Sequence, residues 1–336
     1  SYTSSASVSF KNHLHSFAKE IVEKYGLTKD DLVIDIASND GTLLQGFLSP
    51  DVKVLGVEPS NVAKLAEEKG VTTVNNFFDE TIAKDILQKW GKAKIITATN
   101  VFAHVHKLDS LMNGIKLLLD DEGSFISENH YLKDLIEKLE YDTIYHEHLR
   151  YYGLAQLVTL FEKYDMEVYH VERIPTHGGS IRVFACQKDT HEITPSVASL
   201  LMEEKEMGLT SKQTLLDFAE RVHENKSELL SLLKKLQSEG KKVVGISAPA
   251  RSCTILNFCN IDSSLLSYIT ESSSLKIGKY TPGMNIPIKS DSFLNDEQPD
   301  YALLLSWHLK DSIVPKLRQN GFKGKFIIPL PKPIIL

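Results

Sequence analysis

The stretch LVIDIASNDG, residues 32–41, decides the expected fold of the first half of this chain. Its first five residues are mostly apolar, which predicts a buried strand, and the rest are small or polar, which predicts a turn ending at Gly41. A helix is expected directly afterwards, over Thr42–Leu48. A strand followed by a tight turn and a helix is the starting unit of a parallel α/β sheet.

The same alternation of strand and helix continues to residue 128. Strands are expected at 32–36, 52–57, 71–74, 95–99 and 124–128, and helices at 42–48, 62–69, 80–90 and 108–119. The pattern then changes, because two strand-like runs at 167–174 and 180–187 are joined by a short turn. A mostly parallel sheet that closes with an antiparallel hairpin predicts a methyltransferase-type Rossmann fold.

A second, smaller α/β series follows a charged, helix-forming stretch over Thr194–Gln237. Its strands are expected at 242–246, 265–269, 301–305 and 325–328, with helices at 253–259 and 311–319. We therefore expect an S-adenosylmethionine-binding methyltransferase domain over 1–190, a helical connector over 191–240, and a Rossmann-like α/β substrate-binding domain over 241–336.

A cofactor site is predicted at the carboxyl ends of the first strands, where ligands bind in open α/β sheets. The first turn lacks the G-x-G-x-x-G pattern with which backbone approaches a pyrophosphate, so S-adenosylmethionine is favoured over NAD. Glu58 ends the second strand, where an acidic side chain accepts hydrogen bonds from ribose hydroxyls. Asn76 and Phe77 could meet the adenine, and residues 100–104 would close the pocket. The expected cofactor residues are Asp35, Ala37, Asn39, Asp40, Gly41, Glu58, Pro59, Asn76, Phe77, Asn100, Val101 and His104.

A histidine-rich segment, YDTIYHEH at residues 141–148, lies after the fifth strand and is expected to face the cofactor. A metal site is the weaker interpretation, because no further ligand stands at a fixed spacing, and we expect none. A general base positioned by Glu147, with Tyr145 as a hydrogen-bond donor, is favoured. His148 is the expected functional residue, whereas His146 is expected to satisfy buried backbone groups.

A tight turn at His177-Gly178-Gly179-Ser180 joins the two strands of the hairpin, and its glycines permit positive φ. Arg182 shares a strand face with Ser180 and could contact an anionic substrate. The alternative interpretation of this segment is a plain hairpin turn.

Composition excludes several classes. The 336 residues carry a net charge of −6 without a long basic stretch, which argues against nucleic acid as a partner. No apolar run is long enough to span a membrane. Three scattered cysteines are typical of a reducing cytoplasm and not of a disulfide framework.

Four motifs together resemble the sugar C-methyltransferases: YHEH at 145–148, HGGS at 177–180, G-x-x-A-P-A at 245–250 and Y-T-P-G-x-x-I-P-I at 280–288. That family uses S-adenosylmethionine to methylate nucleotide-linked deoxysugars beside a ketone. The resemblance implies that His148 removes the proton, assisted by Glu147 and Tyr145, and that the enolate attacks the methyl group. It further implies that the second α/β domain completes the substrate cleft. The expected substrate residues are His177, Gly178, Gly179, Ser180, Arg182, Ala250, Arg251 and Ser252, with Arg251 near phosphate.

The chain departs from the family pattern in places. Members usually begin with a cysteine-rich zinc module, and this sequence opens at Tyr2-Thr3 in the stretch that normally follows it, so a module or a larger chain is expected to be missing. The family's A-P-A-K-G turn reads Ala248–Ser252 as APARS here. Three alternatives stay open: an O- or N-methyltransferase, a domain of a multidomain protein, active or silent, and an NAD-dependent oxidoreductase. Deoxysugar biosynthesis is the expected setting.

Overall fold

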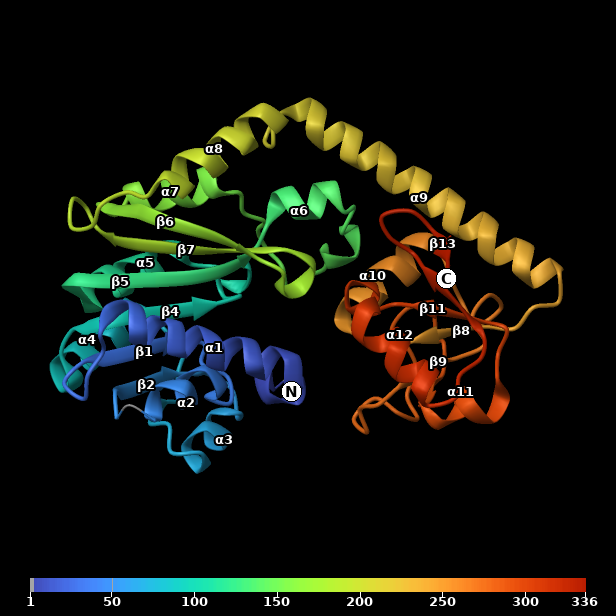
Figure 1. The fold of residues 1–336 in the computed structure, drawn as a ribbon, viewed down its shortest axis with the longest axis horizontal. Coiled ribbons are helices and arrows are strands. Elements are labelled where there is room, and N and C mark those ends of the chain that lie inside the picture. Colours follow the sequence, from blue (N-terminus) through green and yellow to red (C-terminus); the bar gives the residue numbers. More distant parts are fainter. Residues whose placement is uncertain (1–2, 50) are drawn as a thin grey trace. The chain divides into compact units, whose positions relative to one another are not determined.

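The computed structural model describes residues 3–49 and 51–336. Ser1, Pro50 and Tyr2, which starts the stretch expected to follow a zinc module, lie outside the described residues. The chain divides into two compact units. The first unit comprises Ser1–Leu132 and Leu149–Met207, and the second comprises Lys133–His148 and Gly208–Leu336. Each unit contains its own sheet (Figure 1).

The sheet of the first unit has the strand order β3-β2-β1-β4-β5-β7-β6. Its strands are β1 (Leu32–Ile36), β2 (Lys53–Val57), β3 (Thr73–Val74), β4 (Ala93–Thr99), β5 (Leu119–His130), β6 (Met166–Ile174) and β7 (Ser180–Gln187). β1 to β5 pair in parallel, and β7 lies antiparallel between β5 and β6. The predicted methyltransferase-type Rossmann fold is therefore confirmed.

Helices cover this sheet because their apolar residues recur at helical spacing. They are α1 (Val8–Tyr25), α2 (Thr42–Leu48), α3 (Ala63–Glu68), α4 (Glu80–Trp90), α5 (Leu108–Leu118), α7 (Leu154–Glu162) and α8 (Pro195–Met207). α1 begins at Val8, because the Ser7 hydroxyl caps it by accepting from the Phe10 amide at 3.4 Å. It ends at Gly26, whose φ of 57° suits a left-handed cap.

The order of strands sets where the ligand edge lies. The chain leaves β1 toward β2 on one side and returns to β4 on the other, so the carboxyl ends of β1 and β4 flank the point where the strand order reverses. Ligands bind at such a point in open α/β sheets. β1 is buried along its whole length, which fixes Asp35 at this edge.

The sheet of the second unit has the order β10-β9-β8-β11-β12-β13, with only β13 antiparallel. Its strands are β8 (Val243–Ile246), β9 (Ile269–Glu271), β10 (Ile288–Ser290), β11 (Tyr301–Leu304), β12 (Lys325–Ile328) and β13 (Ile334–Ile335). Its helices of six or more residues are α6 (Leu132–Glu137), α9 (Lys212–Ser238), α10 (Ala250–Cys259), α11 (Ser292–Glu297) and α12 (Lys310–Gln319). The first residue of α6, Leu132, still belongs to the first unit. The Rossmann-like arrangement expected for this unit, a mostly parallel sheet with helices, is confirmed.

One expected strand of the second unit is wrong. Residues 265–268 lie outside any strand, because the amides of Leu265 and Leu266 both donate to the Asp262 carbonyl and close a turn. β9 begins only at Ile269, the residue that pairs with Gly245 of β8. Leu265, Leu266 and Tyr268 are buried at or just after this turn, which accounts for their apolar character.

The unit boundaries differ from the expected domain boundaries at two places. Residues 133–148, expected within the first domain, group with the second unit, together with the short helix η3 (Tyr141–Thr143). The expected connector divides at Gly208, so that α8 belongs to the first unit and α9 to the second.

Candidate functional site

The turn after β1 has an unusual backbone. Ala37, Asn39 and Gly41 adopt φ values of 55°, 52° and 73°, in the left-handed region. At Gly41 a side chain has no room, because a Cβ there would lie 2.9 Å from the Cβ of Ala66. The buried Ser38 hydroxyl has no hydrogen-bond partner in the protein. The turn is therefore a strained backbone cradle with a polar group left to satisfy.

Glu58 is fixed beside this cradle at the end of β2. Its carboxylate accepts the Asn39 amide at 3.0 Å and the Ser60 amide at 2.8 Å, and the residue is buried. Two amides from separate segments set the orientation of the carboxylate. A carboxylate at the end of the second strand is suited to accept hydrogen bonds from vicinal hydroxyls of a ribose.

Asp35 lies at the end of β1, fully buried, and accepts the Thr97 hydroxyl at 2.7 Å. Burial raises the pKa of Asp35 to about 7, and the carboxylates of Glu58 and Glu128 add to this, while the hydrogen bond from Thr97 opposes it. Among the described residues, no Lys or Arg forms an ion pair with Asp35 or Glu58. Both groups would therefore favour a ligand that carries positive charge.

Asp40 has a different role from its neighbours. It is fully buried, and its carboxylate accepts hydrogen bonds from Ser5, from Thr42 at 2.6 Å and from Lys69 at 3.0 Å. Burial alone would raise the pKa of Asp40, but these partners together lower it. Asp40 thus joins the N-terminal segment to the turn, and its carboxylate already accepts hydrogen bonds from three protein side chains.

The other expected cofactor residues lie along the same sheet edge. Asn100, with a φ of 57°, follows β4 and donates its amide to the Glu128 carbonyl at 2.8 Å. Phe77 is 74% exposed, so its ring is available to a ligand. The remaining members are the half-buried Pro59, the exposed Asn76, the buried Val101 and the exposed His104 in η2 (Phe102–His104).

The YHEH segment lies in the second unit and forms a small local cluster. His148 is half-buried, its Nδ1 lies 2.9 Å from the Thr143 carbonyl and its Nε2 lies 3.2 Å from the Tyr145 hydroxyl. A carbonyl oxygen only accepts, so Nδ1 carries the proton and Nε2 is left with the lone pair. His146 is exposed, with Nε2 4.0 Å from Glu147. The expectation that His146 satisfies buried backbone groups is therefore wrong.

Tyr145 remains a hydrogen-bond donor. Burial raises the pKa of its hydroxyl, and the Glu147 carboxylate adds to this increase. The ring centroids of Tyr145 and His148 lie 4.4 Å apart. With the lone pair on Nε2, the Tyr145 hydroxyl donates to that nitrogen here, and it can turn to a developing oxyanion once Nε2 has taken up a proton.

The HGGS turn belongs to the first unit and is strained. His177 has a φ of 57°, and Gly178 and Gly179 have φ values of 103° and 155°. Ser180 is buried and its hydroxyl donates to the Thr176 carbonyl at 3.1 Å. The Phe10 ring from α1 packs edge-on against His177 at 5.3 Å. The histidine ring is thus presented by a fixed, unusual backbone.

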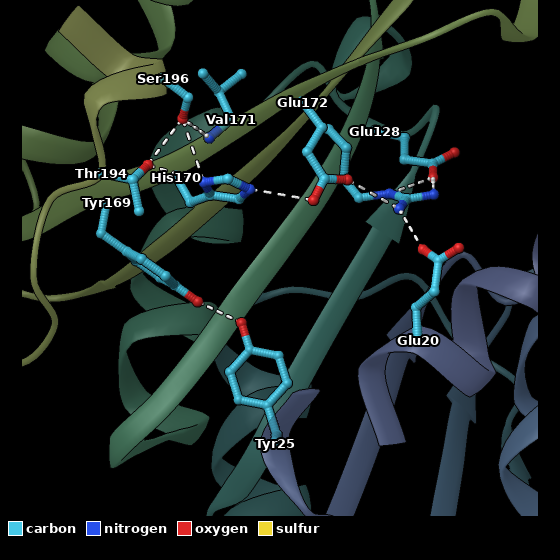
Figure 2. A network of polar contacts seen from close by, with 10 residues as sticks. Glu20, Tyr25, Glu128, Tyr169, His170, Val171, Glu172, Thr194 and Ser196 are labelled. Atoms are coloured by element: carbon cyan, nitrogen blue, oxygen red, sulfur yellow. Dashed lines mark hydrogen bonds and ion pairs between the residues drawn. The ribbon is translucent and has the colours of Figure 1, made fainter. Parts of the chain in front are cut away.

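Arg182 has an environment different from the one expected. It is buried, and its guanidinium forms ion pairs with Glu128 at 2.8 Å and with Glu20 and Glu172 at 3.2 Å each. Figure 2 shows these three carboxylates. His13 adds a contact to Glu128 at 3.1 Å. The guanidinium is saturated by acidic side chains, which favours a structural role for Arg182 over direct contact with an anion.

Arg251 is likewise occupied. It is buried in the second unit, and its guanidinium binds both carboxylate oxygens of Asp142 at 2.7 and 2.8 Å. Ala250, the first residue of α10, is exposed, whereas Ser252 is buried and donates to the Pro249 carbonyl at 2.6 Å. Sequence reasoning missed Asp142, although it is the acidic residue three positions before Tyr145 and adjoins the motif.

The described residues contain neither a cluster of metal ligands nor a membrane-spanning helix. Within residues 3–49 and 51–336, no group of three or more His, Cys, Asp or Glu side chains is arranged to hold a metal ion. In the same described part of the chain, no helix is both long enough and apolar enough to cross a membrane.

Comparison with known proteins matches both halves of the chain. The C-methyltransferase C-terminal domain family matches residues 175–331, and a methyltransferase domain family matches residues 10–171. C-methyltransferase NovU of Streptomyces niveus is 34% identical over 340 residues, which span 100% of this chain and 80% of NovU.

Solved structures are similar over about half of the chain. Magnesium protoporphyrin IX methyltransferase of Synechocystis PCC 6803, solved with bound SAH, is 14% identical over 53% of this chain and 83% of its own, with a TM-score of 0.41. The PH0226 protein of Pyrococcus horikoshii OT3 is 15% identical over 56% of this chain and 95% of its own, with a TM-score of 0.43.

The full-length identity to NovU and the two domain families agree with the motifs and with the strand order of the first sheet. The cofactor implied by these families carries a sulfonium and an ammonium group, which suits the acidic groups without a basic partner at the first sheet's edge. The chain belongs to the sugar C-methyltransferase family and is an S-adenosylmethionine-dependent methyltransferase.

Proposed function

We propose that this enzyme methylates a carbon beside the ketone of a nucleotide-linked keto-deoxysugar, with His148 as the base. The observation that carries the proposal is the orientation of His148, whose Nδ1 is held on the Thr143 carbonyl at 2.9 Å. This contact leaves Nε2 as the basic nitrogen. Histidine titrates near neutrality, where proton abstraction beside a ketone needs its base.

The chemistry divides between the cofactor and the protein. S-adenosylmethionine supplies an electrophilic methyl group at its sulfonium. His148 Nε2 accepts the proton from the carbon beside the ketone, and the electron pair of that C–H bond forms the enolate. Tyr145, protonated because burial and the Glu147 carboxylate raise its pKa, donates to the enolate oxygen. A C–C bond to the methyl group would then form at the same carbon while the methyl–sulfur bond breaks, with its electron pair left on the sulfur of S-adenosylhomocysteine.

Binding roles follow from the geometry of each unit. In the first unit, Glu58 would accept the ribose hydroxyls of the cofactor, Asp35 would meet its positive charge and Phe77 would stack on its adenine. The HGGS turn, with His177 exposed, would contact the sugar substrate. In the second unit, α10 begins at the exposed Ala250, whose backbone amide would suit an anionic group of the substrate.

The pathway and compartment belong to the same proposal. Branched deoxysugar biosynthesis would use such a reaction, and a cytoplasmic setting is supported by Cys186, Cys253 and Cys259, which are all free thiols.

A single experiment tests the proposed reaction. The protein would be incubated in heavy water with a panel of nucleotide-linked 4-keto-6-deoxysugars, with and without S-adenosylmethionine, and the sugars followed by NMR and mass spectrometry. We expect deuterium exchange beside the ketone even without cofactor, and a new carbon-bound methyl group with it. His148→Gln is the control for enzyme-independent exchange. Methylation at oxygen or nitrogen, or no exchange with any sugar, would refute the C-methylation proposal.

A further inference from the structure

The segment that carries His148 is held by one face of α10. Arg251, Thr254 and Phe258 are spaced by three and four residues, so their side chains share that face. Their partners on the segment are Asp142 for the Arg251 guanidinium, the Ile144 carbonyl for the Thr254 hydroxyl at 3.3 Å, and the Tyr141 ring for Phe258 at 5.5 Å between centroids. The helix therefore contacts three residues of the 141–144 segment, namely Tyr141, Asp142 and Ile144.

Asp142 is the most constrained of these partners. Its Oδ2 accepts from Arg251 Nε at 2.7 Å and from Trp307 Nε1 at 2.8 Å, and its Oδ1 accepts from Arg251 Nη2 at 2.8 Å. Asp142 is 1% exposed, Trp307 7% and Arg251 8%. A bidentate guanidinium pair with a third donor leaves the carboxylate one orientation. We call these three residues the Asp142 clamp.

The Asp142 clamp reaches His148 through a single residue. Thr143 follows Asp142 in η3, and its carbonyl is the group 2.9 Å from His148 Nδ1. η3 has only three residues, so the orientation of that carbonyl depends on how Asp142 is held. The Thr143 hydroxyl donates to the Glu140 carbonyl at 2.7 Å, which closes the turn from the other side.

We propose that Asp142, Arg251 and Trp307 are positioning residues that hold His148 in the tautomer with a basic Nε2. The clamp acts on His148 by fixing the Thr143 carbonyl and touches neither substrate nor cofactor. This role rests on the proposed function of His148, and it replaces phosphate binding as the role of Arg251. The other charged and titratable groups close to the Arg251 guanidinium are Glu140 at 3.7 Å, His308 at 3.1 Å and Tyr145.

The variants are chosen to separate positioning from stability. Removing one partner of a buried ion pair leaves an uncompensated charge and destabilises the fold, whereas replacing both partners by neutral residues often restores stability. Trp307→Phe removes one hydrogen bond from Asp142 and keeps the ring. Asp142→Asn with Arg251→Met removes both charges. Glu297→Gln is the control, because it breaks a more exposed ion pair with Lys242 in the same unit.

The first measurement needs no substrate. In protein with ¹⁵N-labelled histidine, long-range ¹H–¹⁵N spectra report the tautomer and titration of His148, which is assigned with His148→Gln. We expect the Nδ1–H tautomer in wild type and Glu297→Gln, a partial mixture in Trp307→Phe, and a full mixture with a shifted titration midpoint in the double variant. A double variant that regains the wild-type melting temperature and also the wild-type tautomer would overturn the proposal, since the clamp would then be only structural.

The second measurement uses the exchange reaction in heavy water. We expect the double variant to lose about 100-fold in kcat for exchange, the scale of a 1 Å misplacement of a catalytic group, with a smaller change in KM. Affinity for S-adenosylmethionine should stay at the wild-type value, because Glu58 and Asp35 lie in the first unit. If no sugar exchanges in wild type while the tautomer responds to the clamp, the substrate proposal fails and the positioning role stands. An unchanged kcat alongside an altered tautomer would refute the link to catalysis.

Discussion

Asp35 should destabilise the ligand-free enzyme above neutral pH, and Asp35→Asn should relieve this. The pKa of Asp35 is about 7 in the folded protein, against an ordinary value of 3.8. The folded state therefore binds an extra proton between these values, so the contribution of Asp35 to stability falls as pH rises from about 4 to 7 and is constant above. At about 1.4 kcal/mol per pH unit, the full loss is on the order of 4 kcal/mol.

The substitution keeps the local contacts. The amide oxygen that Asp35→Asn introduces can still accept the Thr97 hydroxyl, which donates to the Asp35 carboxylate at 2.7 Å. Asp35→Asn should match wild type in unfolding free energy near pH 4, exceed it by about 3 kcal/mol at pH 6, and by about 4 kcal/mol at pH 8. Saturating S-adenosylmethionine should shrink this advantage, because the ionised Asp35 then meets a cation.

The assay must report on the first unit alone, because a chain of two units need not unfold in one step. Trp90 in α4 and Trp307 in the second unit are the only tryptophans, so a Trp307→Phe background leaves Trp90 fluorescence as the reporter. Urea unfolding would be followed from pH 4 to 8, with the exposed Asp85→Asn as the control. A stability difference that stays flat with pH, or that favours wild type at pH 8, would refute the reasoning.

Three further substitutions address separate residues. Glu58→Ala should weaken S-adenosylmethionine binding by about 10- to 100-fold, the value of hydrogen bonds to a charged group, as measured by calorimetry; an unchanged affinity would exclude Glu58 from the ribose role. His148→Asn should leave cofactor affinity within about 2-fold and abolish exchange, since Asn is not a base; retained exchange would remove His148 from that role. Gly41→Ala should cost about 1–3 kcal/mol of stability and lower the melting temperature, because φ is 73° and a Cβ would lie 2.9 Å from Ala66; a variant as stable as wild type would contradict the strain at this turn.

Much of the fold was predictable because it depends on local periodicity. The strand Leu32–Ile36 and the helices Thr42–Leu48 and Glu80–Trp90 have the bounds expected from the sequence. β10 (Ile288–Ser290) was missed because three residues are too few to show alternation. Residues 265–268 misled because burial in a turn and burial in a strand select the same apolar side chains.

The candidate site could be predicted only where the position of a residue depends on its sequence neighbours. The position of Glu58 beside the turn could be predicted because a strand end fixes its place relative to that turn. The surroundings of Arg182 and Arg251 could not be predicted, because a sequence does not show whether a guanidinium already has a carboxylate partner. Asp142 and Trp307 are 165 positions apart, so no local spacing signals their hydrogen bond.

The two sheets show why strand order alone does not assign a ligand. In each, an acidic residue ends the second strand and accepts an amide from the turn after the first: Glu58 from Asn39 at 3.0 Å, and Glu271 from Ala248 at 3.0 Å. Their charge environments differ. Glu271 also accepts the amides of Ser272 and Ser273 and pairs with Lys276 at 3.4 Å.

These partners decide which edge suits a cationic cofactor. Burial alone would raise the pKa of Glu271, but the amides and Lys276 lower it, so its charge is already compensated within the protein. Glu58 has no basic partner among the described residues, and Asp35 beside it is buried with a pKa raised to about 7. A sulfonium and an ammonium group would relieve the unfavourable charge of the buried Asp35 in the first unit. Strand order therefore offers two similar edges, and the acidic groups without a basic partner at the first one support our proposal that S-adenosylmethionine binds there.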